Sequence, residues 1–273
     1  MKERSWALAA LGLALALLAF GCQSTLQSSS STAPQAATTR TAHKRPAAPP
    51  QPQRPPRPAP RPAQRTLVGQ IVYRLPTRRR VVALTFDAGA SNAGAPKILA
   101  VLRATGVEGT FFLTGRWAEL YPQWARRIAA RYPIGNHTFD HRDLLTVSLP
   151  AVRGEILMAS AAIARTTGRP HARLVRFPYG SSSASTLRIA NELGYTAVGW
   201  TVDTLGWEGT STGQSVESVI AHALAHLEPG EIILMHVGSN PTDGSTLDAN
   251  ALATLIREIR RRGYTFVTLT QYL

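Results

Sequence analysis

Val81-Val82-Ala83-Leu84-Thr85-Phe86-Asp87-Ala88-Gly89 is the stretch that decides the fold. Its first six residues form an apolar run rich in β-branched side chains, which is typical of a buried strand, and the run ends in a carboxylate. Similar runs follow at Thr110–Leu113, Ile134–Gly135, Leu174–Phe177, Thr196–Thr201, Glu231–Met235 and Thr265–Thr268.

Segments with helical periodicity separate these runs. They are Ala93–Ala104, Ala118–Arg131, Pro150–Thr166, Ser185–Leu193, Ser215–Leu227 and Asp248–Arg262. Strands that alternate with helices indicate a mainly parallel sheet, and about seven such units fit a barrel better than an open sheet. No glycine-rich GxGxxG turn follows the first strand, which argues against a dinucleotide-binding fold. We therefore predict an α/β fold: a single distorted (β/α) barrel of about seven parallel strands.

Reactive side chains follow five of the predicted strands. The five clusters are Asp87 with Gly89, His137 with His141, Arg176 with Pro178 and Tyr179, Asp203 with Trp207, and Leu234 with His236. Active sites of barrel enzymes gather at the carboxyl ends of the strands, so these clusters are expected to meet in one site. Two imidazoles four residues apart can turn toward one point and hold a metal.

Each cluster also has a simpler structural explanation. Asp87 is a candidate helix cap, Arg176 could close a structural ion pair, and Trp207 could pack in the core. His236 could be a hydrogen-bonded core histidine. Five such coincidences at strand ends are much less plausible together than one shared site. The remaining histidines, His43, His171, His222 and His226, are not expected to take part.

In order and spacing, the clusters resemble the five motifs of the polysaccharide deacetylases, carbohydrate esterase family four, also called the NodB-homology domain. The resemblance runs from about residue 81 to the C-terminus, and its most specific parts are Gly135-Asn136-His137-Thr138, Arg176-x-Pro178-Tyr179-Gly180 and Leu234-x-His236. It implies a distorted barrel that removes N-acetyl, sometimes O-acetyl, groups from chitin, peptidoglycan, xylan or lipo-oligosaccharides with a divalent metal.

The resemblance also implies roles for the residues. Amide hydrolysis needs an activated water, a stabilised oxyanion and a protonated leaving nitrogen. By resemblance, His137 and His141 hold a zinc-like metal, Asp87 accepts the proton of water, and His236 protonates the amine. The backbone N–H of Tyr179, beside Pro178, helps to bind the oxyanion. Arg176 keeps Asp87 ionised, Asp203 belongs to the catalytic group, and Trp207 and Leu234 line the pocket.

Two positions depart from the family pattern. The first motif usually has a second aspartate as the third metal ligand, and Ala88 stands there without a donor atom. Metal binding should therefore be weaker unless Asp87, Asp140 or water fills the gap. The fourth motif commonly has an acidic residue before its tryptophan, and Gly206 stands there. These departures leave two alternatives beside the deacetylase: a catalytically impaired or inactive wall-glycan-binding relative, and an O-acetyl esterase acting on xylan-like glycan.

The N-terminus predicts export. Lys2 and Arg4 precede an apolar run from Trp6 to Phe20, which has the length of a secretory signal core. The only cysteine, Cys22, follows in Leu18-Ala19-Phe20-Gly21-Cys22, which resembles a bacterial lipobox and predicts lipidation. Simple cleavage and a retained anchor are the alternatives. We expect residues 1–22 to be a signal peptide of the lipoprotein type.

Residues 23–65 have the composition of a disordered linker, with Ser and Thr first and then Pro and Arg. This linker has seven Lys and Arg and no acid, and so accounts for half of the net charge of +14. No nucleic-acid-binding module is recognisable, so the linker's expected contacts are weak ones with anionic wall polymers. The catalytic domain is predicted over residues 66–273. We expect a monomer in the cell envelope that faces outward from the membrane and acts on an N-acetylated polysaccharide, peptidoglycan first.

Overall fold

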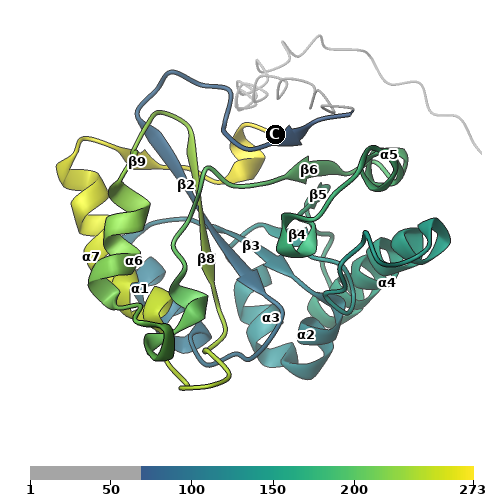
Figure 1. Ribbon diagram of the computed structural model, residues 1–273, viewed down its shortest axis with the longest axis horizontal. Coiled ribbons are helices and arrows are strands. Elements are labelled where there is room, and N and C mark those ends of the chain that lie inside the picture. Colours follow the sequence, from purple (N-terminus) through teal and green to yellow (C-terminus); the bar gives the residue numbers. More distant parts are fainter. Residues whose placement is uncertain (1–68) are drawn as a thin grey trace, which may run out of the picture. The chain divides into compact units, whose positions relative to one another are not determined.

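A computed structural model of the chain describes residues 69–273 (Figure 1). The predicted signal peptide, the lipidation site at Cys22 and all of the predicted linker lie outside these residues. Within the described part of the chain, every helix is too short or too polar to cross a membrane.

A parallel sheet forms the centre of the molecule. Its strands are β1 (Ile71–Val72), β2 (Val81–Ala88), β3 (Thr110–Leu113), β4 (Ile134–Asn136), β5 (Leu174–Val175), β6 (Thr196–Val198), β7 (Val202–Asp203), β8 (Glu231–His236) and β9 (Thr265–Phe266). They lie in the order β1-β6-β5-β4-β3-β2-β8-β7, with β9 paired to the start of β2.

The sheet curls into a barrel because β6 runs on through Gly199–Thr201 into β7. The backbone N–H of Thr201 donates to the carbonyl of Ile232 on β8, while β6 itself pairs with β5. Gly199 permits the bend, since a Cβ there would lie 2.5 Å from the Tyr73 ring. The predicted distorted (β/α) barrel is confirmed, but the predicted strand Thr196–Thr201 ends at Val198, and β7 begins after it, at Val202.

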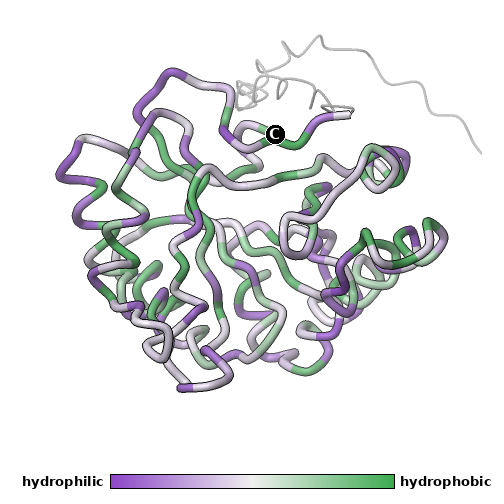
Figure 2. The backbone as a smooth tube through the Cα atoms, viewed as in Figure 1, coloured by the Kyte–Doolittle hydropathy of each residue, from purple (hydrophilic) through white to green (hydrophobic). Residues whose placement is uncertain are grey.

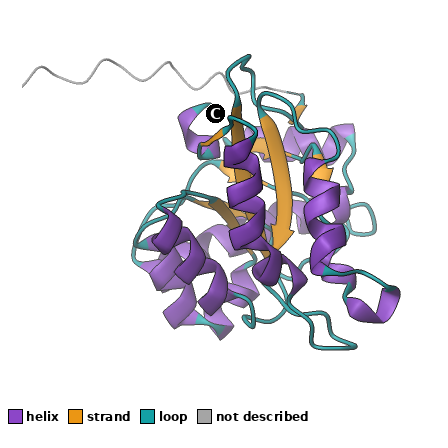
Figure 3. Ribbon diagram, turned by 90° about the vertical axis from the view of Figure 1, so that its left-hand side faces the viewer, coloured by secondary structure: helices purple, strands orange, loops and turns teal. Residues whose placement is uncertain are grey.

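Helices cover the outside of this sheet (Figure 3). They are α1 (Ala95–Thr105), α2 (Gly115–Leu120), α3 (Pro122–Ala129), α4 (Leu149–Thr167), α5 (Ala184–Glu192), α6 (Val216–Leu224) and α7 (Leu247–Arg261). The single helix predicted over Ala118–Arg131 is wrong, because the chain turns at Tyr121 (φ −125°, ψ 56°) before Pro122 starts α3. Proline disfavours a helical conformation in the residue before it and is well suited to the first helical turn.

The core lies on both sides of β2, whose eight residues are all buried. Val82, Leu84, Phe86 and Ala88 pack into the main hydrophobic cluster with α1 and α7. Side chains alternate along a strand, so Asp87 faces away from this cluster, toward the barrel mouth. Figure 2 shows hydrophobic residues along the strands and hydrophilic residues on outer loops.

Strand register brings two predicted site residues together. β2 and β8 are neighbours, and Asp87 is the register partner of His236 at their carboxyl ends. The sheet itself therefore positions both residues at one edge of the barrel.

Candidate active site

A cavity of about 460 Å³ opens at the carboxyl ends of the strands. It is lined by Asp87, Gly89, Ala90, His137, His141, Phe177, Tyr179, Trp200, Asp203, Trp207, Leu234, His236, Gly238, Ser239 and Pro241. All five predicted clusters thus meet in one cavity. Arg176 and Pro178 are buried and do not line it.

Asp87 and Arg176 form a buried ion pair below the cavity. The guanidinium Nη1 donates to Asp87 Oδ1 at 2.8 Å and to the Thr85 hydroxyl at 2.9 Å. Nη2 donates to the carbonyl of Gly199, and the guanidinium stacks on the Phe112 ring. Burial is the largest single influence and raises the pKa of Asp87. The charge of Arg176, the neighbouring rings of His137 and His236 and the hydrogen bond from Arg176 together outweigh burial, and the net pKa lies below the ordinary value. The Asp87 carboxyl is thus held ionised.

The tautomer of His137 is fixed by its surroundings. Its Nδ1 lies 2.9 Å from the carbonyl oxygen of Arg176, which can only accept, so Nδ1 carries the hydrogen. Burial lowers the pKa of His137, so the ring is neutral and Nε2 keeps a lone pair. This Nε2 lies 3.4 Å from Asp87 Oδ2. Two electron-rich atoms therefore face each other at the cavity wall.

Glu155 on α4 organises the loop that carries the two histidines. Its buried carboxylate accepts hydrogen bonds of 2.9 Å from the backbone N–H groups of Phe139 and Asp140. Asn136 accepts from the N–H of Thr138 within the same loop. Glu155 was not predicted as a site residue. An acidic residue on a predicted helix is usually exposed, and no pattern in the sequence shows that this one is buried.

His141 stands between the rings of His137 and Tyr179. Its ring centroid is 4.8 Å from each of them, in edge-to-face geometry. Burial, followed by the neighbouring His137 ring, lowers the pKa of His141 to about 4, so this ring is also neutral near pH 7. Asp140 is not a further donor to the cavity, because it pairs with Arg116 at 2.6 Å and with Arg142.

Backbone strain is concentrated around the cavity. Within residues 69–273, four non-glycine residues have a left-handed conformation: Thr138 (φ 63°), His141 (φ 61°), Tyr179 (φ 58°) and Leu205 (φ 58°). Each costs on the order of 1 kcal/mol or more, and such strain is common at functional sites. Here every instance lies in one of the three loops that carry His137, Tyr179 and Trp207.

Asp203 holds Trp207 at the edge of the cavity. Its Oδ1 accepts from the N–H of Leu205 at 2.9 Å, and its Oδ2 from the indole N–H of Trp207 at 3.3 Å. Burial raises the pKa of Asp203, although the charge of His236 opposes this. The carboxylate of Asp203 is thus directed at the tryptophan loop.

The carboxylate beside His236 comes from Asp248, the second residue of α7. Its Oδ2 lies 2.8 Å from the backbone nitrogen of His236, which donates to it, and 3.5 Å from the ring Nδ1. Asp248 was not predicted as a site residue. In sequence it lies twelve residues beyond His236 and has the ordinary appearance of an acid in the first turn of a helix.

The other described histidines lie outside the cavity, as predicted. His171 contacts the hydroxyl of Tyr195 at 2.8 Å, and the Nδ1 of His222 donates to the carbonyl of Thr204. His226 is exposed.

The donor atoms in the cavity are of a kind that zinc prefers, but they are fewer than the usual three protein ligands. The neutral rings of His137 and His141 can supply nitrogen lone pairs, and the lone pair of His137 Nε2 faces a carboxylate oxygen. Over residues 69–273, however, no three His, Cys, Asp or Glu side chains are grouped so as to hold a metal ion. The side chain of Ala88 is buried in the core cluster and has no donor atom. Two protein ligands would hold the ion, with water or substrate completing the shell.

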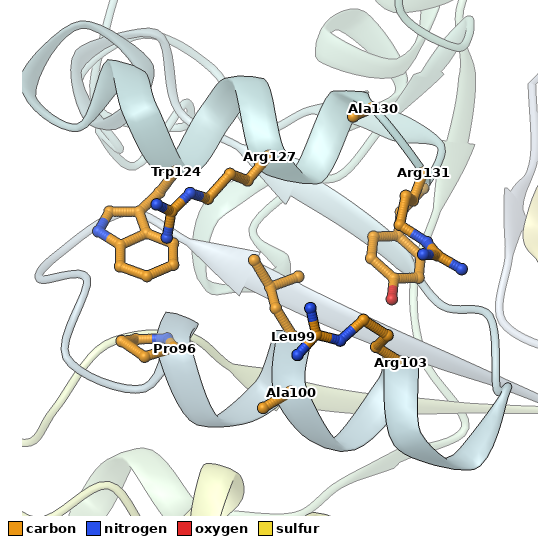
Figure 4. Close-up of a pocket in the computed structure, with 9 residues that line it drawn as sticks. Pro96, Leu99, Ala100, Arg103, Trp124, Arg127, Ala130 and Arg131 are labelled. Carbon is orange, nitrogen blue, oxygen red and sulfur yellow. The ribbon is translucent and has the colours of Figure 1, made fainter.

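A second hollow, of about 530 Å³, lies between α1 and α3, away from these residues (Figure 4). It is lined by Leu99, Trp124 and Tyr132 and edged by arginines, including Arg103 and Arg127. It contains no carboxylate, imidazole or hydroxyl nucleophile apart from the phenol of Tyr132. This hollow therefore offers none of the groups that the first cavity brings together.

A comparison with protein families agrees with this geometry. The sequence profile of the polysaccharide deacetylases matches residues 74–198. A peptidoglycan-N-acetylglucosamine deacetylase of Bacillus cereus is 35% identical over 195 residues, which cover 71% of this chain and 68% of the relative. The chain belongs to the polysaccharide deacetylase family. Two further relatives are each 31% identical to this chain. They are the peptidoglycan-N-acetylmuramic acid deacetylase PdaA of Bacillus subtilis (71% of each chain) and a chitooligosaccharide deacetylase of Azorhizobium caulinodans (73% of this chain, 97% of the relative).

Solved structures agree as well. The peptidoglycan N-acetylglucosamine deacetylase Bc1960 superposes with a TM-score of 0.68 and 33% identity, covering 74% of this deacetylase and 92% of that chain. BA3943, described as a pseudoenzyme of carbohydrate esterase family four from Bacillus anthracis, has a TM-score of 0.68 and 26% identity over 76% and 69% of the chains. The family thus includes similar structures described as enzymes and as a pseudoenzyme.

Proposed function

We propose that this deacetylase removes N-acetyl groups from a cell-wall glycan, with peptidoglycan as the first substrate and chitin-type glycan as the second. One observation carries the proposal: Asp87 and His236 are register partners on adjacent strands and line the same cavity as His137 and His141. A proton acceptor and a proton donor are therefore available beside one pair of imidazoles.

The reaction that we propose uses Asp87 and His236 in turn. Ionised Asp87, kept so by Arg176, takes a proton from water as the water oxygen attacks the acetyl carbonyl carbon. His236 then gives a proton to the amide nitrogen, and the C–N bond breaks to release acetate and a free amine. Both transfers need only short proton paths, because the two side chains come from paired positions of one sheet.

The remaining residues bind and orient the substrate. The backbone N–H of Tyr179, held in its left-handed conformation after Pro178, is our candidate donor to the developing oxyanion. Trp207 and Leu234 line the cavity on the side of His236, where we place the acetyl methyl group and the sugar face. Trp207 is 48% exposed, which leaves its ring free to stack on a sugar.

We also propose that His137 and His141 hold a divalent metal, most readily zinc, since neutral imidazole is a preferred zinc ligand. When bound, such an ion would polarise the acetyl carbonyl and increase the acidity of water. Without a third protein ligand at Ala88, we expect binding weaker than in sites with three.

The location that we propose follows from the N-terminal sequence. Export with lipidation at Cys22 would tether the chain to a membrane, and the Pro/Arg-rich linker would extend the deacetylase into the wall. The basic linker would make weak contacts with anionic wall polymers. This placement favours the cell's own wall glycan over a nutrient polymer.

Acetate release is the test. The purified protein is supplied with zinc and incubated with peptidoglycan, chitooligosaccharides and O-acetylated xylan. We expect acetate from the first two, and a drop of at least 100-fold for Asp87→Asn and for His236→Ala. His226→Ala, an exposed histidine outside the cavity, is the matched control and should keep full activity. Full activity in both site variants would overturn the proposal, and release from xylan alone would favour an O-acetyl esterase.

A catalytically impaired or inactive glycan-binding protein is the second candidate. It is favoured by Ala88 and by the structural similarity to BA3943. It predicts saturable glycan binding with no acetate release at any metal concentration.

Ala88→Asp separates impairment from a repurposed site. The carboxylate would enter a buried position, so we expect a lower melting temperature without metal and a larger zinc-induced rise than in the wild type. Gain of turnover together with that rise would show that a metal ligand was missing. A stable variant with no change in zinc response would show that residue 88 does not reach the metal.

A further inference from the structure

The space beside Gly206 is filled by the side chain of Asp248. A Cβ built on Gly206 would lie 2.4 Å from Asp248 Oδ1 and 2.6 Å from its Cγ, and its three nearest atoms all belong to that carboxylate. Contacts below 3.0 Å require one side to move. Residue 206 can therefore have no side chain while Asp248 keeps its place, although its backbone φ does not itself require glycine.

Asp248 is engaged at both oxygens. Oδ1 accepts from the hydroxyl of Thr204 at 2.6 Å, and Oδ2 accepts from the backbone N–H of His236 at 2.8 Å. The carboxylate is only 3% exposed. Within residues 69–273, its one cationic partner is the ring of His236, since no lysine or arginine pairs with it. A buried carboxylate is costly without such a partner.

The ring of His236 in turn depends on Asp248. Its Nδ1 is buried, has no hydrogen-bond partner among the described residues, and lies at an ion-pair distance of 3.5 Å from Asp248 Oδ2. Asp203, whose charge also acts on the ring, is occupied by the N–H groups of Leu205 and Trp207. Between residues 69 and 273, Asp248 is thus the one carboxylate within ion-pair distance of Nδ1.

Five charged or titratable groups from the surrounding elements face the ring. They are Asp87 on β2, Asp203 on β7, Asp248 on α7, and His137 and His141 from the loop after β4. Burial opposes protonation of the ring, but interaction with Asp248, and then the charges of Asp87 and Asp203, outweigh it and raise the pKa of His236. Asp248 is the largest favourable contributor among the three carboxylates.

We propose that Asp248 is the positioning residue of His236. Its carboxylate orients the ring and keeps a proton on Nδ1, and the absence of a side chain at Gly206 gives it the space to do so. Gly206 and Asp248 are then coupled: residue 206 has no carboxylate to place beside His236, and Asp248 on α7 supplies one in the space that Gly206 leaves. The catalytic consequence rests on the proposed function, whereas the effect on the ring does not.

The test follows the His236 ring by NMR titration of the full chain, with His236→Gln to assign its signal. In Asp248→Asn we expect the pKa of His236 to fall by about one unit or more, because a neutral amide replaces a charged partner. The alkaline limb of kcat/KM should move to lower pH by the same amount. Thr204→Val is the matched control: it removes the other hydrogen bond of Asp248 and leaves its charge, so the pKa of His236 should stay within about 0.3 of wild type.

A carboxylate swap tests the pairing with Gly206. Gly206→Asp alone should weaken folding through the clash, whereas Gly206→Asp combined with Asp248→Ser has room for the new carboxylate. In the double variant we expect the pKa of His236 to return at least halfway from the Asp248→Ser value toward that of wild type. This arm also serves if Asp248→Asn fails to fold.

The outcomes are distinct. A His236 pKa that is unchanged in folded Asp248→Asn, or that moves equally in Thr204→Val, would show that Asp248 only ties α7 to β8, and the inference would be overturned. An unrestored pKa in a folded double variant would overturn the pairing with Gly206. If wild type releases no acetate while the ring still responds to Asp248→Asn, the proposed function fails and the positioning role stands.

Discussion

Arg176 connects several parts of the site through one buried guanidinium. It is completely buried, and its guanidinium binds the hydroxyl of Thr85, the carboxylate of Asp87 and the carbonyl of Gly199. It thereby joins β2 to the bend where the barrel closes. Removing one partner of a buried ion pair leaves an uncompensated charge, which costs more than the net energy of the pair.

We therefore expect Arg176→Met to destabilise the protein by about 3–5 kcal/mol and to raise the pKa of Asp87. Urea unfolding at pH 7 measures the first effect. Arg188→Met, which breaks an exposed pair with Glu192, is the control and should cost less than about 1 kcal/mol. An equal loss in the two variants would contradict a special role for the buried pair.

The residues that carry chemistry could be predicted because they follow strands, and strand ends are visible in sequence. Asp87, His137, His141, Tyr179, Trp207 and His236 were all predicted and all line the cavity. Glu155 and Asp248 could not be predicted in the same way, since both lie on helices, where acidic residues are usually solvated. Their burial depends on tertiary packing, which no local pattern expresses.

The loop that carries His137 and His141, here called the histidine loop, is held by hydrogen bonds from two helices. The start of α2 binds it through the N–H groups of Gly115 and Arg116, which donate to the carbonyls of Thr138 and Phe139. The carboxylate of Glu155 on α4 accepts hydrogen bonds from backbone N–H groups of the same loop. Two helices from different parts of the chain therefore hold the strained conformations of Thr138 and His141.

Glu155→Ala should release this loop. Two backbone N–H groups would lose a charged acceptor, so we expect a loss on the order of 2 kcal/mol in unfolding free energy and at least tenfold in activity. Zinc titration should show weaker binding than in wild type. Glu119→Ala, which breaks an exposed ion pair with Arg165, should change neither activity nor metal binding.

β8 begins with a titratable group in an apolar setting. Glu231 is 2% exposed, and burial raises its pKa to about 7, although the N–H of Glu228 and the charge of Arg74 oppose this. In the unfolded chain the carboxyl titrates near its ordinary value of 4.5. The folded state therefore prefers the protonated form, and this contribution to stability is lost as the pH rises through about 7.

Glu231→Gln should remove the loss of stability that ionisation of Glu231 causes as the pH rises. We expect the variant to be more stable than wild type at pH 8 by on the order of 2 kcal/mol, with the difference vanishing below about pH 4.5. Denaturant unfolding across pH 4–8 measures it. A constant difference at all pH values would instead indicate a change in packing or hydrogen bonding.

The existence and type of most elements followed from hydrophobic periodicity, but their ends did not. β1, β5 and β7 have two residues each, too few to give a periodic pattern. The break between α2 and α3 was missed because the amphipathic pattern continues across Pro122. The bend at Gly199 depends on the approach of Tyr73, a contact between residues far apart in sequence.

At the level of the whole chain, all the residues to which we assign a chemical role lie in the described part. Within residues 69–273, every residue that lines the cavity lies between Asp87 and Pro241. Anchoring and chemistry should therefore be separable.

Deleting residues 23–65 should leave kcat/KM on soluble chitooligosaccharides within about twofold of the full chain, because no catalytic group is lost. Activity on intact cell walls should fall in the same variant if the linker supplies reach and polyanion contacts. Cys22→Ala should move the protein from the membrane fraction to the soluble fraction. Unchanged membrane attachment would argue for a retained signal anchor.

The pairing of Asp87 with His236 makes the spacing of the two groups a property of the sheet. Adjacent strands lie about 4.8 Å apart whatever sequence they carry, and the two residues occupy matched positions on such strands. The surrounding loops can then diverge in length and composition, and so accept a different sugar or acyl group, without disturbing the gap that the proton must cross. Grafting loops from relatives onto this barrel is accordingly a route to new specificities with the proton-transfer geometry unchanged.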